Sequence, residues 1–323
     1  MGVRPLARAL VCLAWALAAW SAQARDPDCP AEPDVPWQSV APGVWVWDGA
    51  NDEPGPGNGG HVMPTTALVH GARAMVIDPG PGMRHAQRVK RSLRCRFGAQ
   101  VRDVINTHAH AENALGNAAF ADEIAAGTVT VWATLGTRQA MEQRCPACLE
   151  SLTARVGADA MHGTHIVWPT ATLFEDDTLV LGPLQLQVMR VEQGHTDADL
   201  VLWLPEAGVL WAGGLVHDGR LPEFAQGTLD GWLAALQRLA ALQPRVVVGS
   251  RVGGPDMLAA TQQYLTTLRR RVLAGMDAGR VAGEPGLVPM PEWSHWAGHA
   301  RQEFNTQRAW RELEPVWMGV PTR

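Results

Sequence analysis

The stretch Thr107-His108-Ala109-His110-Ala111-Glu112-Asn113 places two histidines one residue apart, directly after the apolar run Val101–Ile105. Alternate residues of an extended backbone point the same way, so both imidazoles can face one metal ion. A third histidine, His195, lies in Gly194-His195-Thr196, directly after the strand-like run Leu184–Val191. Three imidazoles with an open fourth position are the ligand set of a hydrolytic zinc site. The sequence therefore predicts a zinc ion on His108, His110 and His195.

The first 24 residues have the pattern of a secretory signal peptide. Arg4 and Arg8 precede the apolar core Ala9–Trp20, which is short for a membrane span, and Ala22-Gln23-Ala24 resembles a cleavage site. No later stretch is long and apolar enough to cross a bilayer, so we expect an exported mature chain without a transmembrane segment. One lysine beside 26 arginines is typical of a GC-rich bacterial genome, and export from such a cell leads to the periplasm.

The charge pattern argues against a nucleic acid partner. Cleavage would remove two arginines and no acid, which leaves 25 basic residues against 32 acidic ones and changes the formal charge from −5 to −7. Nothing basic is clustered along the chain, so nucleic acid and anionic membranes are not expected partners. A small-molecule substrate is expected instead.

Four cysteines follow the expected cleavage site: Cys29, Cys95, Cys145 and Cys148. An even number in an oxidising compartment predicts disulfides. We expect Cys145 and Cys148 to form a local structural disulfide. A redox or metal role for this pair is the alternative, although a lone Cys-x-x-Cys is a weak zinc signal. Cys29 and Cys95 would then form a second bridge that ties the N-terminal arm to the body.

Short apolar runs rich in Val, Ile and Trp alternate with helical patterns along the chain. The expected strands are 44–47, 67–69, 74–77, 101–106, 128–133, 178–181, 184–191, 200–204, 209–212 and 246–248, and the expected helices are 83–94, 135–158, 228–242, 255–278 and about 296–313. Two halves, each of strands followed by helices, predict two sheets packed face to face with helices outside. The long Gly/Pro-rich loop Asn51–Met63 is expected to border the site.

These motifs and their order resemble the metallo-β-lactamase superfamily. The turn Asp78-Pro79-Gly80 matches its structural aspartate, residues 107–113 fall on its His-x-His-x-Asp-His motif, and His195 falls on its next histidine. Residues 211–214 match the strand that ends in a metal-bridging aspartate, and residues 246–250 match the strand that ends in a Gly-His ligand. The resemblance implies an α/β fold, a four-layer αββα sandwich. Residues 25–323 would form one such domain, with a C-terminal helical extension from about residue 280.

Within this superfamily, several segments look like the quinoprotein relay system zinc metallohydrolases. They are residues 112–120, Cys145–Glu150, Gly219–Pro222 with Gly231–Leu233, and Asn305–Glu314. This finer resemblance implies an exported protein that is associated with periplasmic pyrroloquinoline-quinone dehydrogenase systems.

The chain departs from the family pattern at its second metal site. The four positions that normally hold those ligands are Glu112, Asn113, Gly214 and Ser250, and of these only Glu112 is a good ligand. The three-histidine first site is intact, so we expect one zinc ion per chain. Asp78 and Asn113 are expected to support the site, Asp78 by accepting backbone hydrogen bonds that hold the histidine loop.

Glu112 has two interpretations, as a general base or proton shuttle and as a carboxylate that orients a ligand histidine. His61, in the long loop, and His217, three residues after Gly214, are candidates for contacts with substrate or for auxiliary ligands. The predicted activity is zinc-dependent hydrolysis of an ester, thioester or amide. A true β-lactamase is not expected, because the missing second-site ligands normally serve its nucleophile. The alternative is an inactive accessory or binding protein that keeps the fold.

Overall fold

The computed structural model describes Cys29 and residues 35–320. The predicted signal peptide, residues 1–24, lies outside the described residues. Within them, no helix has the length and apolar character needed to span a membrane.

The first sheet has seven strands in the order β1-β2-β3-β4-β5-β6-β7. They are β1 (Gln38–Ala41), β2 (Val44–Trp47), β3 (Thr65–His70), β4 (Arg73–Ile77), β5 (Gln100–Ile105), β6 (Thr130–Ala133) and β7 (Ala171–Thr172). Neighbours from β1 to β4 are antiparallel, and neighbours from β4 to β7 are parallel. Because β4 and β5 are parallel neighbours, the residues that follow them emerge at the same edge of the sheet.

The second sheet has six strands in the order β13-β12-β11-β10-β9-β8. They are β8 (Thr178–Leu181), β9 (Leu184–Glu192), β10 (Ala198–Leu204), β11 (Val209–Trp211), β12 (Val246–Val248) and β13 (Val252–Gly253). Only the β11–β12 pair is parallel. Both sheets are therefore mixed.

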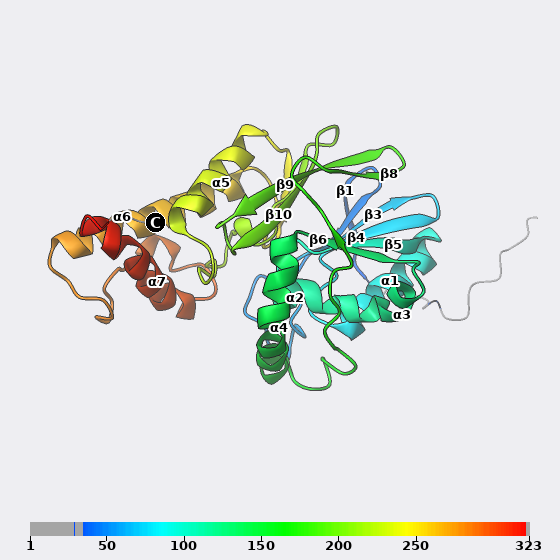
Figure 1. The fold of residues 1–323 in the computed structure, drawn as a ribbon, viewed down its shortest axis with the longest axis horizontal. Coiled ribbons are helices and arrows are strands. Elements are labelled where there is room, and N and C mark those ends of the chain that lie inside the picture. Colours follow the sequence, from blue (N-terminus) through cyan, green and yellow to red (C-terminus); the bar gives the residue numbers. More distant parts are fainter. Residues whose placement is uncertain (1–28, 30–34, 321–323) are drawn as a thin grey trace, which may run out of the picture.

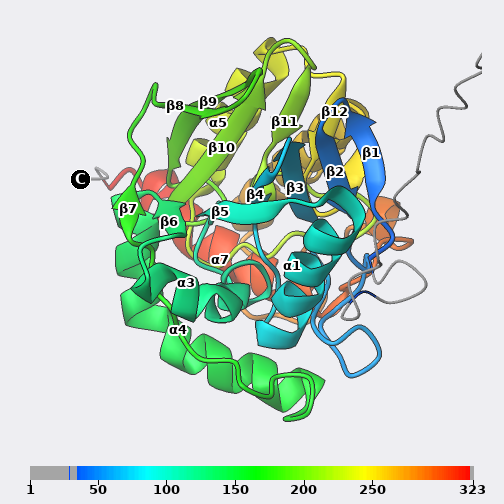
Figure 2. The same cartoon turned by 90° about the vertical axis from the view of Figure 1, so that its right-hand side faces the viewer.

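Helices cover the outer face of each sheet (Figures 1 and 2). The helices α1 (Met83–Phe97), α2 (Ala111–Ala114), α3 (Ala121–Ala125) and α4 (Leu135–Val156) lie on the side of the first sheet, together with the 3-10 helix η1 (Leu115–Phe120). The helices α5 (Leu229–Ala241), α6 (Asp256–Asp277) and α7 (Ala300–Trp317) lie on the side of the second sheet. Short 3-10 turns η2 (Gly213–Leu215) and η3 (Pro291–Trp293) complete the described elements.

The strand β10 shows how the sequence builds these layers. Its side chains alternate between the two faces of the sheet. Leu200 and Leu202 belong to the core between the two sheets, together with first-sheet residues such as Ile77. Val201 and Trp203 belong to the core beneath α5, α6 and α7. The predicted four-layer αββα arrangement is confirmed.

The hydrophobic pattern of the sequence did not predict the short strands β1, β7 and β13 or the run of helical turns from Ala111 to Ala125. These pieces are too short, or too interrupted by Gly and Asn, to show a clear hydrophobic period. The last helix begins at Ala300, four residues later than expected. Gly298 has a left-handed backbone with φ of 79°, so the helix cannot extend back through it to Trp296.

The cysteines follow the prediction in one pair and contradict it in the other. Cys29 and Cys95 form a disulfide, as expected. Cys145 and Cys148 are free thiols, so the predicted local disulfide is wrong. Both stand inside α4, where they pack in different places: Cys145 is buried with Ala109 and its neighbours, whereas Cys148 packs in the adjoining cluster with Leu152.

Candidate metal centre

The histidine loop is fixed by a buried aspartate on the neighbouring strand. Asp78 follows β4 directly and adopts a left-handed backbone with φ of 52°. Its Oδ1 accepts a hydrogen bond from the Thr107 backbone N–H at 2.9 Å, and its Oδ2 accepts from Thr107 Oγ1 at 2.7 Å and from Asn113 Nδ2 at 3.0 Å. These contacts join Asp78 and Asn113 to the loop that carries His108 and His110.

Burial raises the pKa of Asp78 to about 6, although the hydrogen bonds from Thr107 and Asn113 oppose this shift. The Glu112 carboxylate adds a smaller upward push to the same pKa. The carboxyl group of Asp78 is 4 % exposed and is fully engaged in holding the loop. Both of its oxygens accept hydrogen bonds from Thr107 and Asn113.

The three predicted histidines come together from both sheets. His108 and His110 follow β5 of the first sheet, and His195 lies in the turn between β9 and β10 of the second. One ring nitrogen from each lies within 4.8 Å of the others. The ring centroids are 4.7 Å apart for His108–His110, 5.2 Å for His108–His195 and 4.7 Å for His110–His195.

In two of these rings, a hydrogen bond occupies one nitrogen and leaves the other available for a metal. His108 Nδ1 lies 2.9 Å from Thr107 Oγ1, which itself donates to Asp78. His110 Nε2 lies 3.0 Å from Gln226 Oε1. Metal-ligating histidines usually donate their outer N–H to such acceptors. His108 Nε2 and His110 Nδ1 are therefore the nitrogens that remain available.

The spacing and charge state of the rings fit a metal ion. His195 Nε2 lies 3.2 Å from His110 Nδ1. Two ligands of a tetrahedral zinc ion, each at about 2.0–2.1 Å, stand about 3.3 Å apart. Burial lowers the pKa of His108 and His195, and the nearby histidines lower it further. Both rings are thus held neutral, which is the form that ligates.

The positions of the family's second site are used differently here. Asn113 donates its amide to Asp78, and the buried Ser250 Oγ accepts from the Asp218 backbone N–H at 3.2 Å. A Cβ placed on Gly214 would lie 2.1 Å from Cδ2 of His195. The His195 ring therefore fills the space in which a bridging carboxylate would begin.

Glu112 is half-buried beside His110 at the start of α2. Burial raises its pKa, but the charges of His110, Arg220 and Arg301 and a backbone hydrogen bond outweigh burial, so the pKa lies below its ordinary value. The side chain is thus an ionised carboxylate near neutral pH. This state suits either of its two interpretations.

The two auxiliary histidines have different locations. The His217 ring is buried, with its centroid 5.8 Å from that of His195. The His61 ring packs instead against Trp47 and His85, at centroid distances of 4.4 Å each. The structure therefore brings His217 next to the three histidines and leaves His61 in a separate aromatic cluster.

Sequence reasoning missed Gln226, Arg220 and Arg301. Gln226 lies in an irregular segment 116 positions from its partner His110. The two arginines influence the pKa of Glu112 from the segment after η2 and from α7. Only the structure shows this proximity, since no spacing pattern in the sequence connects these residues to the histidine loop.

A cavity of about 250 Å³ adjoins the histidines. His110, Glu112, Cys148, Arg155 and Arg301 are among its lining residues, with apolar contributions from Pro54, Ala147 and Leu152. Pro54 belongs to the long loop Asn51–Met63, so the expectation that this loop borders the site is confirmed.

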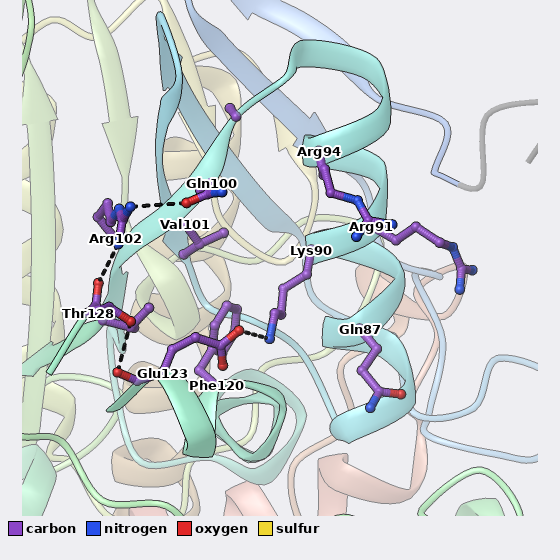
Figure 3. Close-up of a pocket in the computed structure, with 12 residues that line it drawn as sticks. Gln87, Lys90, Arg91, Arg94, Gln100, Val101, Arg102, Phe120, Glu123 and Thr128 are labelled. Atoms are coloured by element: carbon purple, nitrogen blue, oxygen red, sulfur yellow. Dashed lines mark hydrogen bonds and ion pairs between the residues drawn. The ribbon is translucent and has the colours of Figure 1, made fainter. Parts of the chain in front are cut away.

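A roomier cavity of about 610 Å³ lies elsewhere, between α1, the start of β5 and α3 (Figure 3). Its walls carry the basic residues Lys90, Arg91, Arg94 and Arg102. Lys90 pairs with Glu123 at 2.5 Å, as the dashed line in Figure 3 shows. None of the three clustered histidines lines this cavity. Its size alone therefore does not make it the functional site.

Two mixed sheets packed face to face between helices, with histidines gathered at the strand ends, define a metallo-β-lactamase fold. The family model described as the metallo-beta-lactamase superfamily matches residues 59–251, more than half of the chain. The chain belongs to this superfamily. Among curated proteins, none matches the sequence.

Two solved structures are similar to this one in fold. A metallo-β-lactamase from Pontibacter korlensis is 21% identical, with a TM-score of 0.55, over 71% of this chain and 98% of that one. The DIM-1 metallo-β-lactamase exposed to ceftazidime is 18% identical, with a TM-score of 0.56, over 73% of this chain and 98% of that one. At these identities the likeness concerns the fold alone.

Proposed function

We propose that this protein is a metal-dependent hydrolase with one zinc ion held by His108, His110 and His195. The observation that carries the proposal is the cluster of three ring nitrogens within 4.8 Å, with the outer nitrogens of His108 and His110 already engaged. The remaining nitrogens would be His108 Nε2, His110 Nδ1 and His195 Nε2. Only one good ligand, Glu112, remains at the second-site positions, which supports a single ion.

When bound, a zinc ion would lower the pKa of a coordinated water to about 7 and polarise a substrate carbonyl. The residues of the chain supply the rest. Glu112 is ionised and lies beside His110, so it can accept a proton from water and pass it to the leaving group. Gln226 and the Thr107–Asp78 pair hold two of the imidazoles in fixed orientations.

The cavity supports a small substrate. Its volume of about 250 Å³ lies below the roughly 300–1,000 Å³ of sites for drug-sized ligands. Its lining combines apolar side chains with charges of both signs, from Arg155 and Arg301 and from Glu112 and Glu223. We propose an ester, thioester or amide with a short acyl group.

Location and partners form part of the same proposal. The signal-peptide pattern supports export to the periplasm, and the segments that resemble quinoprotein relay system metallohydrolases support association with a quinoprotein dehydrogenase system. Two of those segments lie together in the fold: Asn305 Nδ2 donates to the Pro222 carbonyl at 2.8 Å. Co-purification of the tagged protein from periplasmic extract with a quinoprotein dehydrogenase would support this association, and its absence under mild conditions would count against it.

The test of the central proposal combines metal analysis with a panel of small esters, thioesters and amides. We expect one zinc ion per wild-type chain and zinc-dependent turnover of at least one substrate. His195→Ala should lose both. His165→Ala, a substitution at an exposed histidine, should keep both. Two tightly held ions per chain, or none after zinc is supplied, would contradict the proposed site.

The second candidate is an accessory protein that keeps the fold without catalysis. The filled space at Gly214 favours it, since a side chain there would have to displace the His195 ring. A wild-type protein that binds one zinc ion but turns over nothing in the panel would favour this candidate over the hydrolase.

A further inference from the structure

Two buried polar side chains beside the three histidines lack the partners that burial normally requires. His217 is 2 % exposed and Arg220 is 1 % exposed. Both belong to the segment Val216–Arg220, which follows directly after the 3-10 turn η2. That turn contains Gly214, so the segment lies on the side of the site from which the second-metal ligands are missing.

The backbone of His217 is fixed while its ring is unpartnered. Thr261 Oγ1 accepts from the His217 backbone N–H at 2.8 Å and donates to the His217 carbonyl at 2.8 Å. Neither ring nitrogen of His217 has a hydrogen-bond partner among the described residues. Burial lowers the pKa of His217, and the nearby Gly214 backbone opposes this shift, but Gly214 does not meet hydrogen-bond geometry with either ring nitrogen. A buried imidazole in this state needs a ligand or a water to satisfy it.

Arg220 is a buried cation without a close anion. One of its terminal nitrogens donates to the Asp52 carbonyl at 2.6 Å, and the other contacts Met63 Sδ at 3.1 Å. Its Nε has no partner, and among the described residues no carboxylate lies within the 4.0 Å of an ion pair. Burial lowers the pKa of Arg220 to about 10, which leaves it charged at neutral pH.

No surrounding carboxylate pairs directly with Arg220, although Glu112, Glu53 and Glu223 attract it from beyond ion-pair distance. The neighbouring Arg301 already has its own anions, with Glu53 at 2.8 Å and Glu223 at 3.6 Å. Glu112 and Arg220 attract each other only beyond ion-pair distance. A charge held in this way is costly unless an anion arrives to pair with it.

We propose that His217 and Arg220 form a subsite for a carboxylate oxygen beside the three-histidine centre. Arg220 Nε–H and a ring N–H of His217 would donate to that oxygen. This inference rests on the proposed hydrolysis, in which one water adds to the acyl carbon, the bond to the leaving group breaks, and the acyl oxygens leave as a carboxylate. His217 and Arg220 do not themselves line the 250 Å³ cavity, but Glu112 and Arg301, whose charges act on Arg220, do, so the subsite would lie close to the place where we expect the substrate to bind.

The test uses acetate as the probe and acetamide as its uncharged control. Protein labelled with ¹⁵N-histidine is titrated in its metal-free and zinc-loaded forms, and the His217 ring signals are assigned with His217→Gln. We expect acetate to shift the His217 ring signals in both forms. Arg220→Gln should weaken acetate binding about tenfold or more, because a charge-assisted hydrogen bond is lost. Arg269→Gln, at an arginine on the exposed side of α6, should leave acetate affinity unchanged.

Circular dichroism and zinc content establish whether each variant is folded. If Arg220→Gln does not fold, the acetate titrations of wild type and of Arg220→Lys test the subsite instead. Lysine keeps the charge of arginine but not its Nε–H. Acetate that leaves the His217 signals unmoved overturns the subsite, and so does equal affinity in wild type and the Arg220 variant. Equal binding of acetamide would show that charge is not recognised and would also overturn it.

This experiment separates the subsite from the proposed function. Acetate binding to the metal-free protein requires no turnover, so it can succeed even if no substrate is hydrolysed. Conversely, zinc-dependent hydrolysis without any response of His217 to acetate would leave the hydrolase standing and remove the subsite.

Discussion

Gly214 has no side chain, and the ring of His195 packs directly against its Cα. The distance of 2.1 Å from a built Cβ to His195 Cδ2 is far below van der Waals contact. Any substitution there must move either the turn η2 or the ring. Because the ring is one of three candidate ligands, the glycine determines where the third nitrogen lies. The lack of a side chain at Gly214 and the position of the His195 ring are therefore coupled.

Restoring the family's aspartate should damage this site. We expect Gly214→Asp to displace His195 and to weaken zinc binding by about 10–100-fold or more, the range seen when the support of a ligand is lost. Zinc titration with a competing chelator measures this. Gly57→Asp is the control, since nothing lies within 4 Å of a Cβ there. A Gly214→Asp protein that binds two ions would show that the second site can be rebuilt by a single change.

Glu112 lines the proposed substrate cavity together with His110. If it moves the proton, Glu112→Gln should lower the hydrolysis rate by about 10²–10⁴-fold, because a proton-transfer group is removed. The zinc content should stay at the wild-type value, since Glu112 is not among the three clustered residues. Steady-state rates with metal analysis on the same samples check both. Unchanged rates would leave Glu112 with an orienting role only.

Individual residues also show which parts of the site can be predicted from the sequence and which cannot. His108 and His110 share one short motif after a strand, so their convergence could be predicted. Gln226 could not be predicted, because its contact with His110 depends on how an irregular segment folds back over the site. For the same reason, the orphaned Nε of Arg220 becomes visible only once the loop Asn51–Met63, which contacts the terminal nitrogens of Arg220, is in place.

At the scale of elements, α4 explains why the predicted Cys145–Cys148 bridge is absent. The helix runs from Leu135 to Val156 around both cysteines, and each sulfur packs with different neighbours. Burial raises the pKa of the Cys145 thiol to about 12, and burial raises that of Cys148 as well. Both groups are therefore protonated at neutral pH and react slowly.

We expect two free thiols, Cys145 and Cys148, per unfolded mature chain without any reductant. In the native protein, Cys145 should be modified by iodoacetamide far more slowly than Cys148, which is half-buried and lines the substrate cavity. Peptide mass spectrometry after timed alkylation measures both rates. No free thiol in the unfolded, unreduced protein would show that the pair is oxidised after all.

Most strands and helices follow from the hydrophobic pattern, because each is amphipathic or fully buried over several residues. Strands β7 and β13 have two residues each, so they carry no period and depend on pairing with a neighbour. The start of α7 depends on the left-handed backbone of Gly298. Tertiary contacts thus decide the short elements and the ends of the longer ones.

For the molecule as a whole, buried histidines connect stability to pH. Burial lowers the pKa of His61 to about 4, with a smaller contribution from the charge of Arg88, although a hydrogen bond of the ring to the Trp47 backbone raises it. Between pH 6.5 and about 4 the unfolded chain takes up a proton at this position and the native chain does not. The contribution of His61 to the free energy of unfolding is therefore fully present above pH 6.5 and is lost as the pH falls towards 4. The raised pKa values of Asp78 and Asp199, about 6 each, act in the opposite direction.

The contribution of His61 can be isolated with His61→Phe, which keeps a ring against Trp47 and His85. As the pH falls from 6.5 to about 4, we expect wild type to lose more stability than the variant. The slopes of the free energy of unfolding against pH should differ by at most about 1.4 kcal/mol per pH unit, which corresponds to one bound proton. Urea unfolding across this range measures the difference. Parallel curves would show that His61 titrates alike in the folded and unfolded states.

The three histidines come from two different sheets, since His108 and His110 follow β5 and His195 lies between β9 and β10. An ion on all three would join the halves of the molecule as a crosslink that only the native state possesses. Binding of this kind raises the midpoint of thermal unfolding with the concentration of free metal. Chelation should lower that midpoint in wild type and leave it unchanged in His195→Ala. A cell starved of the metal would then hold a smaller quantity of the protein, because the unloaded chain unfolds and is degraded sooner.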